Sequence, residues 1–133
     1  MDEDPRLARA AAMDRARAHE SARAGRMIQD FVRAAGEAGI PAEPLVARGY
    51  DGRGLYRTNV QGWYLKRDRS VAAGTDGEFY VMSVQGGLTA RLRGAQLEPS
   101  DPPLELGRGG RDGESLPLDE AIAKRLAGGA TWG

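Results

Sequence analysis

The chain has no cysteine, a single histidine and few aromatic residues. Without cysteine, disulfides and thiolate chemistry are excluded. His19 has neither a cluster of acidic residues nor a cysteine at metal-ligand spacing, so we expect no metal site and no cofactor. No apolar run approaches the roughly 18 residues of a membrane-spanning helix. The acidic start, Met1-Asp2-Glu3-Asp4, is unlike a signal peptide, which predicts a cytoplasmic protein with no membrane partner.

Catalytic patterns are also missing. None of the serines lies in a Gly-x-Ser-x-Gly elbow. The carboxylates Asp68, Asp76 and Glu78 lie where we expect strand ends and turns, and turn chemistry accounts for them. We therefore expect a protein that is not an enzyme.

The charge is balanced but unevenly distributed. The 133 residues have a formal net charge of zero and the length of one domain. Residues 5–93 carry 15 basic and 9 acidic side chains, whereas residues 94–133 carry 4 and 7. Such asymmetry favours either internal neutralisation or a partner surface. Arginine outnumbers lysine 17 to 2, which indicates a GC-rich coding sequence and a bacterial origin.

Residues 5–38 are predicted to form one long helix. Asp4 can cap its start, with Pro5 at the first helical position, and Gly39 followed by Pro41 ends it. Its second half has an apolar stripe with helical period, which predicts docking on the rest of the fold. The stripe consists of Ala24, Met27, Ile28, Phe31, Val32 and Ala35.

The first half of this helix has little to bury, because Leu7 and Met13 are its only large apolar residues. It therefore either projects into solvent or packs on a partner. Ala8, Ala12 and Ala16 form a ridge of small residues that another helix can approach closely. We accordingly predict that Leu7, Met13 and Ala16 contact a protein partner or a second copy of the chain. The predicted function is that of a small soluble accessory or regulatory protein acting through protein–protein contact.

The middle of the chain changes to a period of two, which predicts an antiparallel sheet over residues 55–106. Residues 41–54 are expected to be a connection, and residues 88–92 one of three to five meandering strands. One face of the sheet is predicted to form the core. That face comprises Trp63, Leu65, Val71, Phe79 and Val81.

A short helix is predicted over residues 117–127, with Ser115 as a candidate cap and residues 128–133 as a tail. Its buried stripe is expected to include Leu118, Ile122 and Leu126. The chain is therefore predicted to be a single α+β domain: a long N-terminal helix, an antiparallel meander and a short C-terminal helix.

Two alternatives to the helix contact remain open. The first is nucleic-acid binding by a basic, aromatic sheet face, in which the tyrosines stack on bases and the cations hold phosphates. Its candidate residues are Tyr56, Arg57, Tyr64, Lys66 and Arg67. The second is anion binding, or an unrecognised active site, in the glycine-rich segment 107–115, where backbone amides and arginines can converge on an anion. Its candidate residues are Arg108, Gly109, Gly110 and Arg111.

Three segments carry a resemblance to other proteins: Gly62-Trp63-Tyr64-Leu65-Lys66, Gly74-Thr75-Asp76-Gly77 and Phe79-Tyr80-Val81. In this order the chain resembles short actinobacterial proteins that have no assigned function. The resemblance implies no activity, cofactor or site residue.

Overall fold

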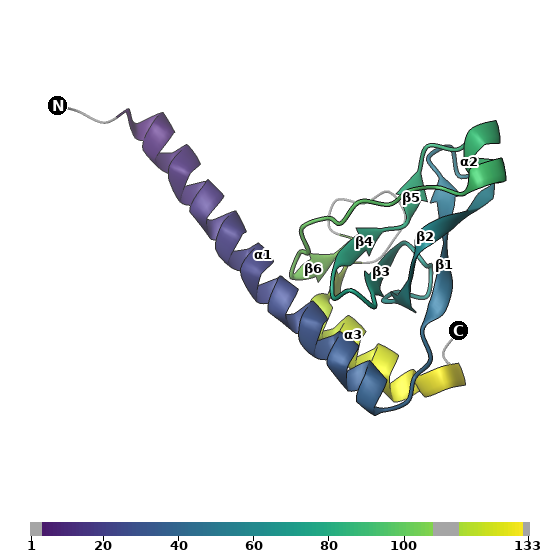
Figure 1. The fold of residues 1–133 in the computed structure, drawn as a ribbon. Coiled ribbons are helices and arrows are strands. Elements are labelled where there is room, and N and C mark those ends of the chain that lie inside the picture. The colour runs from purple at the N-terminus through teal and green to yellow at the C-terminus, as the bar shows by residue number, and fades with distance from the viewer. Residues whose placement is uncertain (1–3, 108–114, 132–133) are drawn as a thin grey trace.

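The computed structural model describes residues 4–107 and 115–131 (Figure 1). Its helices are α1 (Pro5–Glu37), α2 (Leu88–Arg93) and α3 (Leu118–Gly128), followed by a 3-10 turn at Gly129–Thr131. Its strands are β1 (Glu43–Gly49), β2 (Leu55–Tyr64), β3 (Val71–Gly74), β4 (Phe79–Val81), β5 (Ser83–Val84), β6 (Glu105–Leu106) and β7 (Leu116–Pro117).

Helix α1 is anchored to the body by its second half only. It begins as predicted, because the Asp4 carboxylate accepts a hydrogen bond from the backbone N–H of Arg6 at 2.9 Å and Pro5 is the first helical residue. Its buried residues are Ala24, Ile28, Phe31 and Ala35. Every residue from 5 to 20 is exposed, and this half extends away from the sheet in Figure 1. We call residues 5–23 the arm.

The main sheet has the order β4-β3-β2-β1-β5, with antiparallel pairs except for β1 and β5, which are parallel. Its two outer strands, β4 and β5, are separated in the chain by Met82 alone. The Met82 N–H donates to the Ser70 carbonyl on the β3 side, and its carbonyl accepts from the Arg48 N–H of β1. One bent strand therefore joins both ends of the sheet, and the sheet closes into a small barrel.

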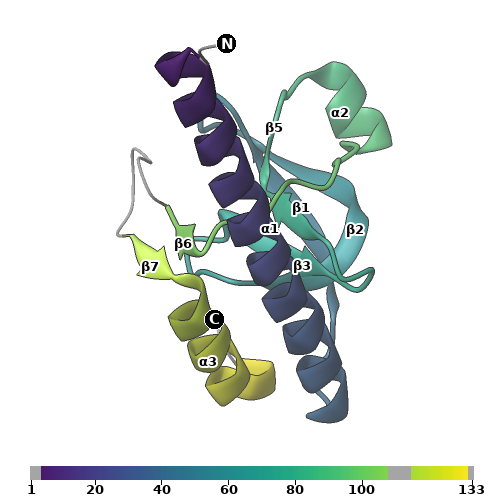
Figure 2. The ribbon, with the colours of Figure 1, turned by 90° about the vertical axis from the view of Figure 1, so that its left-hand side faces the viewer.

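The closed sheet buries its inner face, and the helices cover part of its outer face. Trp63, Leu65 and Phe79 face outward and form one core with α1 and α3. Tyr64 and Tyr80, their neighbours in the chain, face into the barrel and form a second core with Leu45 and other residues. Figure 2 shows α1 crossing in front of the sheet with α3 beside its lower half.

Trp63 is the centre of the core between the helices and the barrel. Its ring meets the Phe31 ring edge to face, with centroids 5.8 Å apart and planes at 87°. Its indole N–H donates to the Ile40 carbonyl at 3.0 Å, so the polar atom of this buried side chain is satisfied. These contacts fix the end of α1 against β2.

Three predictions about the sheet are wrong. The predicted connection 41–54 contains β1, in which Leu45 and Ala47 are buried at alternate positions. The predicted strand 88–92 is helix α2, because Leu, Ala and Arg favour helix and Gly87 and Gly94 bound the segment. Val81 is not in the core, since 45% of its surface is exposed beyond the reach of the helices.

The C-terminal helix is confirmed. Leu118 and Ala121 are buried, and Ile122 and Leu126 pack against the same core as Trp63. Arg125 is also buried, and it donates to the Gly129 carbonyl at 2.8 Å; burial lowers the pKa of its guanidinium, opposed by the charge of Glu43.

The predicted serine cap of this helix is wrong. The Ser115 hydroxyl instead donates to the Glu105 carboxylate at 2.6 Å, across the short β6–β7 ribbon, and Pro117 occupies the cap position. The described part of the predicted tail, residues 129–131, forms the 3-10 turn.

Candidate interaction surfaces

The arm carries the residues that the sequence singled out for partner contact. Leu7 and Met13 are 70% and 56% exposed, and Ala16 is exposed as well. Met13 lies 18 residues before the buried Phe31, which is about five turns of helix at 3.6 residues per turn, so both occupy the same side of α1. The docked face of α1 therefore continues, uncovered by any described residue, along the arm.

Charged residues lie on this continued face beside Met13. The positions about five turns before Ala24 and Ala35 are Arg6 and Arg17, which lie to either side of Met13 along the helix. Arg17 pairs with Asp14 at 3.8 Å, and Arg6 with Asp4 at 3.6 Å. Both pairs are exposed, so they hold the arginines loosely and leave them able to meet a partner.

The proposed base-stacking surface is not formed. Tyr56 and Tyr64 are only 8% and 5% exposed, because both rings lie in the core inside the barrel. The Tyr64 hydroxyl accepts from the Val46 N–H at 2.8 Å and donates to the Val46 carbonyl at 3.3 Å. The Tyr56 hydroxyl accepts from the Gly87 N–H at 3.2 Å. These tyrosines link parts of the barrel and cannot stack on a nucleic acid.

The cations of that hypothesis have other surroundings. Lys66 pairs with Asp68 at 3.5 Å, and the Arg57 guanidinium lies 3.5 Å from the Leu92 carbonyl of α2, to which it donates. Partial burial tends to raise the pKa of Asp68, but hydrogen bonds from Ser70 and the charge of Lys66 outweigh burial and lower it. Arg67 is exposed on the same turn.

The same turn packs on a buried tyrosine through a strained residue. Arg69 has a φ of 62°, a left-handed conformation that side chains other than glycine rarely adopt. Its guanidinium carbon lies 5.4 Å from the centroid of the Tyr64 ring, which is within the range of a cation–π contact.

Replacing Tyr64 by phenylalanine is expected to lower the free energy of unfolding by about 1–3 kcal/mol, because both backbone groups of Val46 lose their tyrosine partner inside the barrel. Thermal or denaturant unfolding measures this effect. The matched control is Tyr50→Phe, since Tyr50 is highly exposed. Equal stability of the two variants would contradict the structural role of Tyr64.

The candidate anion site lies outside the described residues, which include neither Arg108, Gly109, Gly110 nor Arg111. Within residues 4–107 and 115–131, no group of three or more His, Asp or Glu side chains could hold a metal ion. No helix in this part of the chain is long and apolar enough to cross a membrane.

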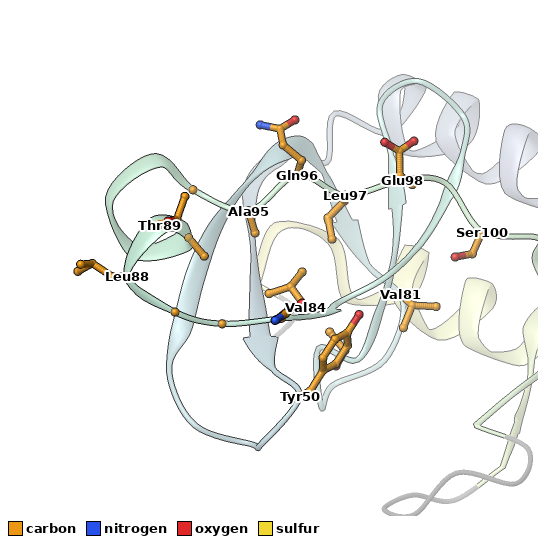
Figure 3. Close-up of a pocket in the computed structure, with 16 residues that line it drawn as sticks. Tyr50, Val81, Val84, Leu88, Thr89, Ala95, Gln96, Leu97, Glu98 and Ser100 are labelled. Atoms are coloured by element: carbon orange, nitrogen blue, oxygen red, sulfur yellow. The ribbon is translucent and has the colours of Figure 1, made fainter.

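A second surface feature was not predicted. An open slot of ≈ 770 Å³ lies between β5 and the extended segment 94–100, with α2 at one end (Figure 3). Figure 3 shows Val84 and Leu97 pointing toward each other across it, with the Tyr50 ring beside Val84. Gly86-Gly87 and Gly94 flank α2 and are visible in the sequence. Glycines at these positions do not predict that β5 and segment 94–100 lie apart and leave a slot between them.

The side chains at the slot are otherwise apolar or neutral, with Glu98 as the only charged lining residue. Its carboxylate points away from the slot in Figure 3, as does the Gln96 amide. The slot thus offers apolar side chains and backbone groups, and no described arrangement of nucleophile, acid and base.

Comparison with known proteins adds no family assignment: no protein-family model, no curated protein and no solved structure matches this chain.

Proposed function

We propose that this protein is a non-enzymatic interaction module that self-associates through its arm. The observation that carries the proposal is the exposed continuation of the docked face of α1, with Met13 at 56% exposure on the same side of the helix as Phe31. A helix stabilised by docking at one end can extend into solvent without a new nucleation cost, so the arm is available as helix before it meets a partner.

The arm is complementary in charge to a second copy of itself. Arg6 lies seven residues before Met13 and Glu20 lies seven residues after it, so all three lie close to one side of the helix. If two arms pack antiparallel about Met13, Arg6 of each lies level with Glu20 of the other. Two reciprocal ion pairs then flank a central pair of methionines, and such flanking pairs set the orientation of helix pairs.

The small residues of the arm allow this packing, and the small apolar area limits its strength. Ala10 and Ala16 lie on either side of Met13 and permit close approach of the helices. Burying each methionine contributes about 1.5–3 kcal/mol. Association costs about 4–15 kcal/mol, which the two methionines alone do not outweigh. The dimer therefore depends on the flanking ion pairs and the alanine contacts as well, and we expect it to be weak, forming only at high micromolar concentration. Leu7 lies further round the helix and adds little to this face.

Reversing one charge is expected to abolish the dimer. In the antiparallel pair, Arg6→Glu places a glutamate at position 6 of each copy opposite Glu20 of the other, so both ion pairs become repulsive. The double variant Arg6→Glu/Glu20→Arg restores both ion pairs. Light scattering at several concentrations and two salt concentrations measures the molar mass of each. Both positions are exposed on the arm, so all variants should unfold at similar temperatures.

A chain lacking residues 1–23 is expected to be a monomer and serves as the reference. A full-length protein that stays monomeric at high micromolar concentration would contradict self-association. A dimer that tolerates Arg6→Glu would show that another surface holds the copies together.

A further inference from the structure

Among the residues that the structure describes, strand β5 pairs along only one of its two edges. The Arg48 N–H donates to the Met82 carbonyl and the Tyr50 N–H to the Val84 carbonyl, so the β1 ladder engages residues 82 and 84. Because backbone groups alternate in direction along a strand, the N–H and C=O of Ser83 point to the opposite edge, toward the slot. No described residue hydrogen-bonds to the backbone of Gln85, which continues this edge.

The opposite wall of the slot presents the same kind of edge. The Ala95 N–H donates to the Arg57 carbonyl at 2.7 Å, and the Leu97 N–H donates to the Asn59 side-chain oxygen at 2.8 Å. The alternate residue, Gln96, makes no backbone hydrogen bond within the described residues. Since no residue of β2 lines the slot, the free groups of Gln96 face it. Two walls with unpaired backbone groups thus flank one gap.

We propose that the slot binds an extended peptide segment of another protein, which adds a strand to β5 and carries alternating apolar and acidic side chains. The backbone of an added strand would hydrogen-bond to the donors and acceptors that both walls leave unpaired at strand spacing. A chain added at β5 would lie between two walls, β5 and segment 94–100, with α2 at one end (Figure 3).

The apolar part of the peptide is inferred from the exposed side chains at the slot. Tyr50 and Val81 are 73% and 45% exposed and, like Val84, line the slot. Natural proteins commonly place lysine or proline on an exposed apolar strand edge, which prevents another chain from pairing with it. Residues 81–87 contain neither lysine nor proline. Alternate side chains of an added strand would cover these two residues.

The acidic part is inferred from charge. Arg48 is opposite Ser83 in the β1–β5 register, so its exposed side chain lies on the same face of the sheet as that of Ser83. Helix α2, whose first residues line one end of the slot, carries Arg91 and Arg93 in its last turn. Like Arg48, these two lie outside the lining, and the carboxylate of the acidic lining residue Glu98 points away from the slot in Figure 3. None of the three arginines forms an ion pair with a described residue. A carboxylate on the peptide would complement this uncompensated positive charge.

The test uses the full chain and a displayed library of random nine-residue peptides. Enriched sequences are expected to alternate apolar residues and to include Asp or Glu. A synthetic peptide with the enriched sequence should protect the Ser83 and Gln85 amides from hydrogen exchange. If no peptide is enriched, or if enriched peptides leave these two amides unprotected, the proposal is wrong.

Two substitutions at one position separate backbone pairing from side-chain contact. Ser83→Pro removes the free N–H and leaves the β1 ladder intact, so it should weaken binding of the synthetic peptide by about tenfold. Ser83→Ala keeps the N–H and should bind within about twofold of the native chain. Equal affinity of both variants for the peptide would overturn strand addition.

Two further variants test the charge and keep the result interpretable if Ser83→Pro fails to fold. Arg48→Gln should weaken binding and reduce its dependence on salt, because a surface charge has been removed. Arg33→Gln, on an exposed position of helix α1 outside the slot lining, should leave peptide affinity unchanged. Peptide binding that is insensitive to Arg48→Gln would contradict the acidic character of the ligand.

Discussion

Replacing Phe79 by alanine is expected to lower the free energy of unfolding by about 3–5 kcal/mol. Phe79 is only 3% exposed and packs in the same core as Trp63 and Phe31, so its removal leaves a cavity between the barrel and the helices. Thermal unfolding followed by circular dichroism should show a midpoint lower by roughly 10 °C or more.

Val81→Ala, two residues further along the same bent strand, is the matched control. Val81 is largely exposed, so this variant should cost less than about 1 kcal/mol. The pair tests how far the helices cover this face of the strand, because Phe79 and Val81 share one face and an alternation read from sequence alone places both residues in the core. Similar losses from the two substitutions would mean that the covered part of this face extends to Val81.

Replacing Gly62 by alanine is expected to destabilise the fold by about 3 kcal/mol, the upper part of the range for overpacking. A methyl group at this position would lie 2.0 Å from the Ala73 carbonyl oxygen and 2.8 Å from the Gly74 Cα. Both atoms belong to the backbone of the paired strand β3, so neither can move without breaking the β2–β3 ladder. Denaturant unfolding measures the loss.

Gly25→Ala is the control for this substitution. Nothing lies within 4 Å of a methyl group at Gly25, which is inside helix α1. Alanine should therefore stabilise the protein by about 0.5–1 kcal/mol, through its higher helix propensity. A Gly62→Ala variant as stable as the native chain would show that β2 and β3 are not in such close contact.

The sequence was sufficient for helices α1 and α3, but not for the short helix α2, which it predicted to be a strand. Caps, proline position and apolar period act within one segment, so Asp4, Pro5 and Gly39 define α1 without knowledge of its neighbours. The same local rules placed α3 through Leu118 and Ala121. The exposed arm was also predictable, because a segment with so few large apolar residues has no face to bury.

The barrel could not be predicted from local pattern. Its strands bury both faces, so Trp63 and Tyr64 are both in a core and alternation no longer distinguishes inside from outside. Strand β1 was missed for a related reason, because Pro44 and the nearby glycines resemble a connection while the pairing that makes it a strand comes from β2 and β5.

The slot depended most on tertiary structure. It exists because the chain bends at Met82, pairs β5 with β1 and then sends segment 94–100 to the edges of β2 and β4. None of these contacts is local, and each joins residues that the sequence separates by a dozen or more positions. The sequence alone thus determined helices α1 and α3, the absence of cysteine chemistry and the uncovered arm. Only the tertiary structure decided which tyrosines are buried and where a strand edge stays open, because these depend on which segments meet across the closed sheet.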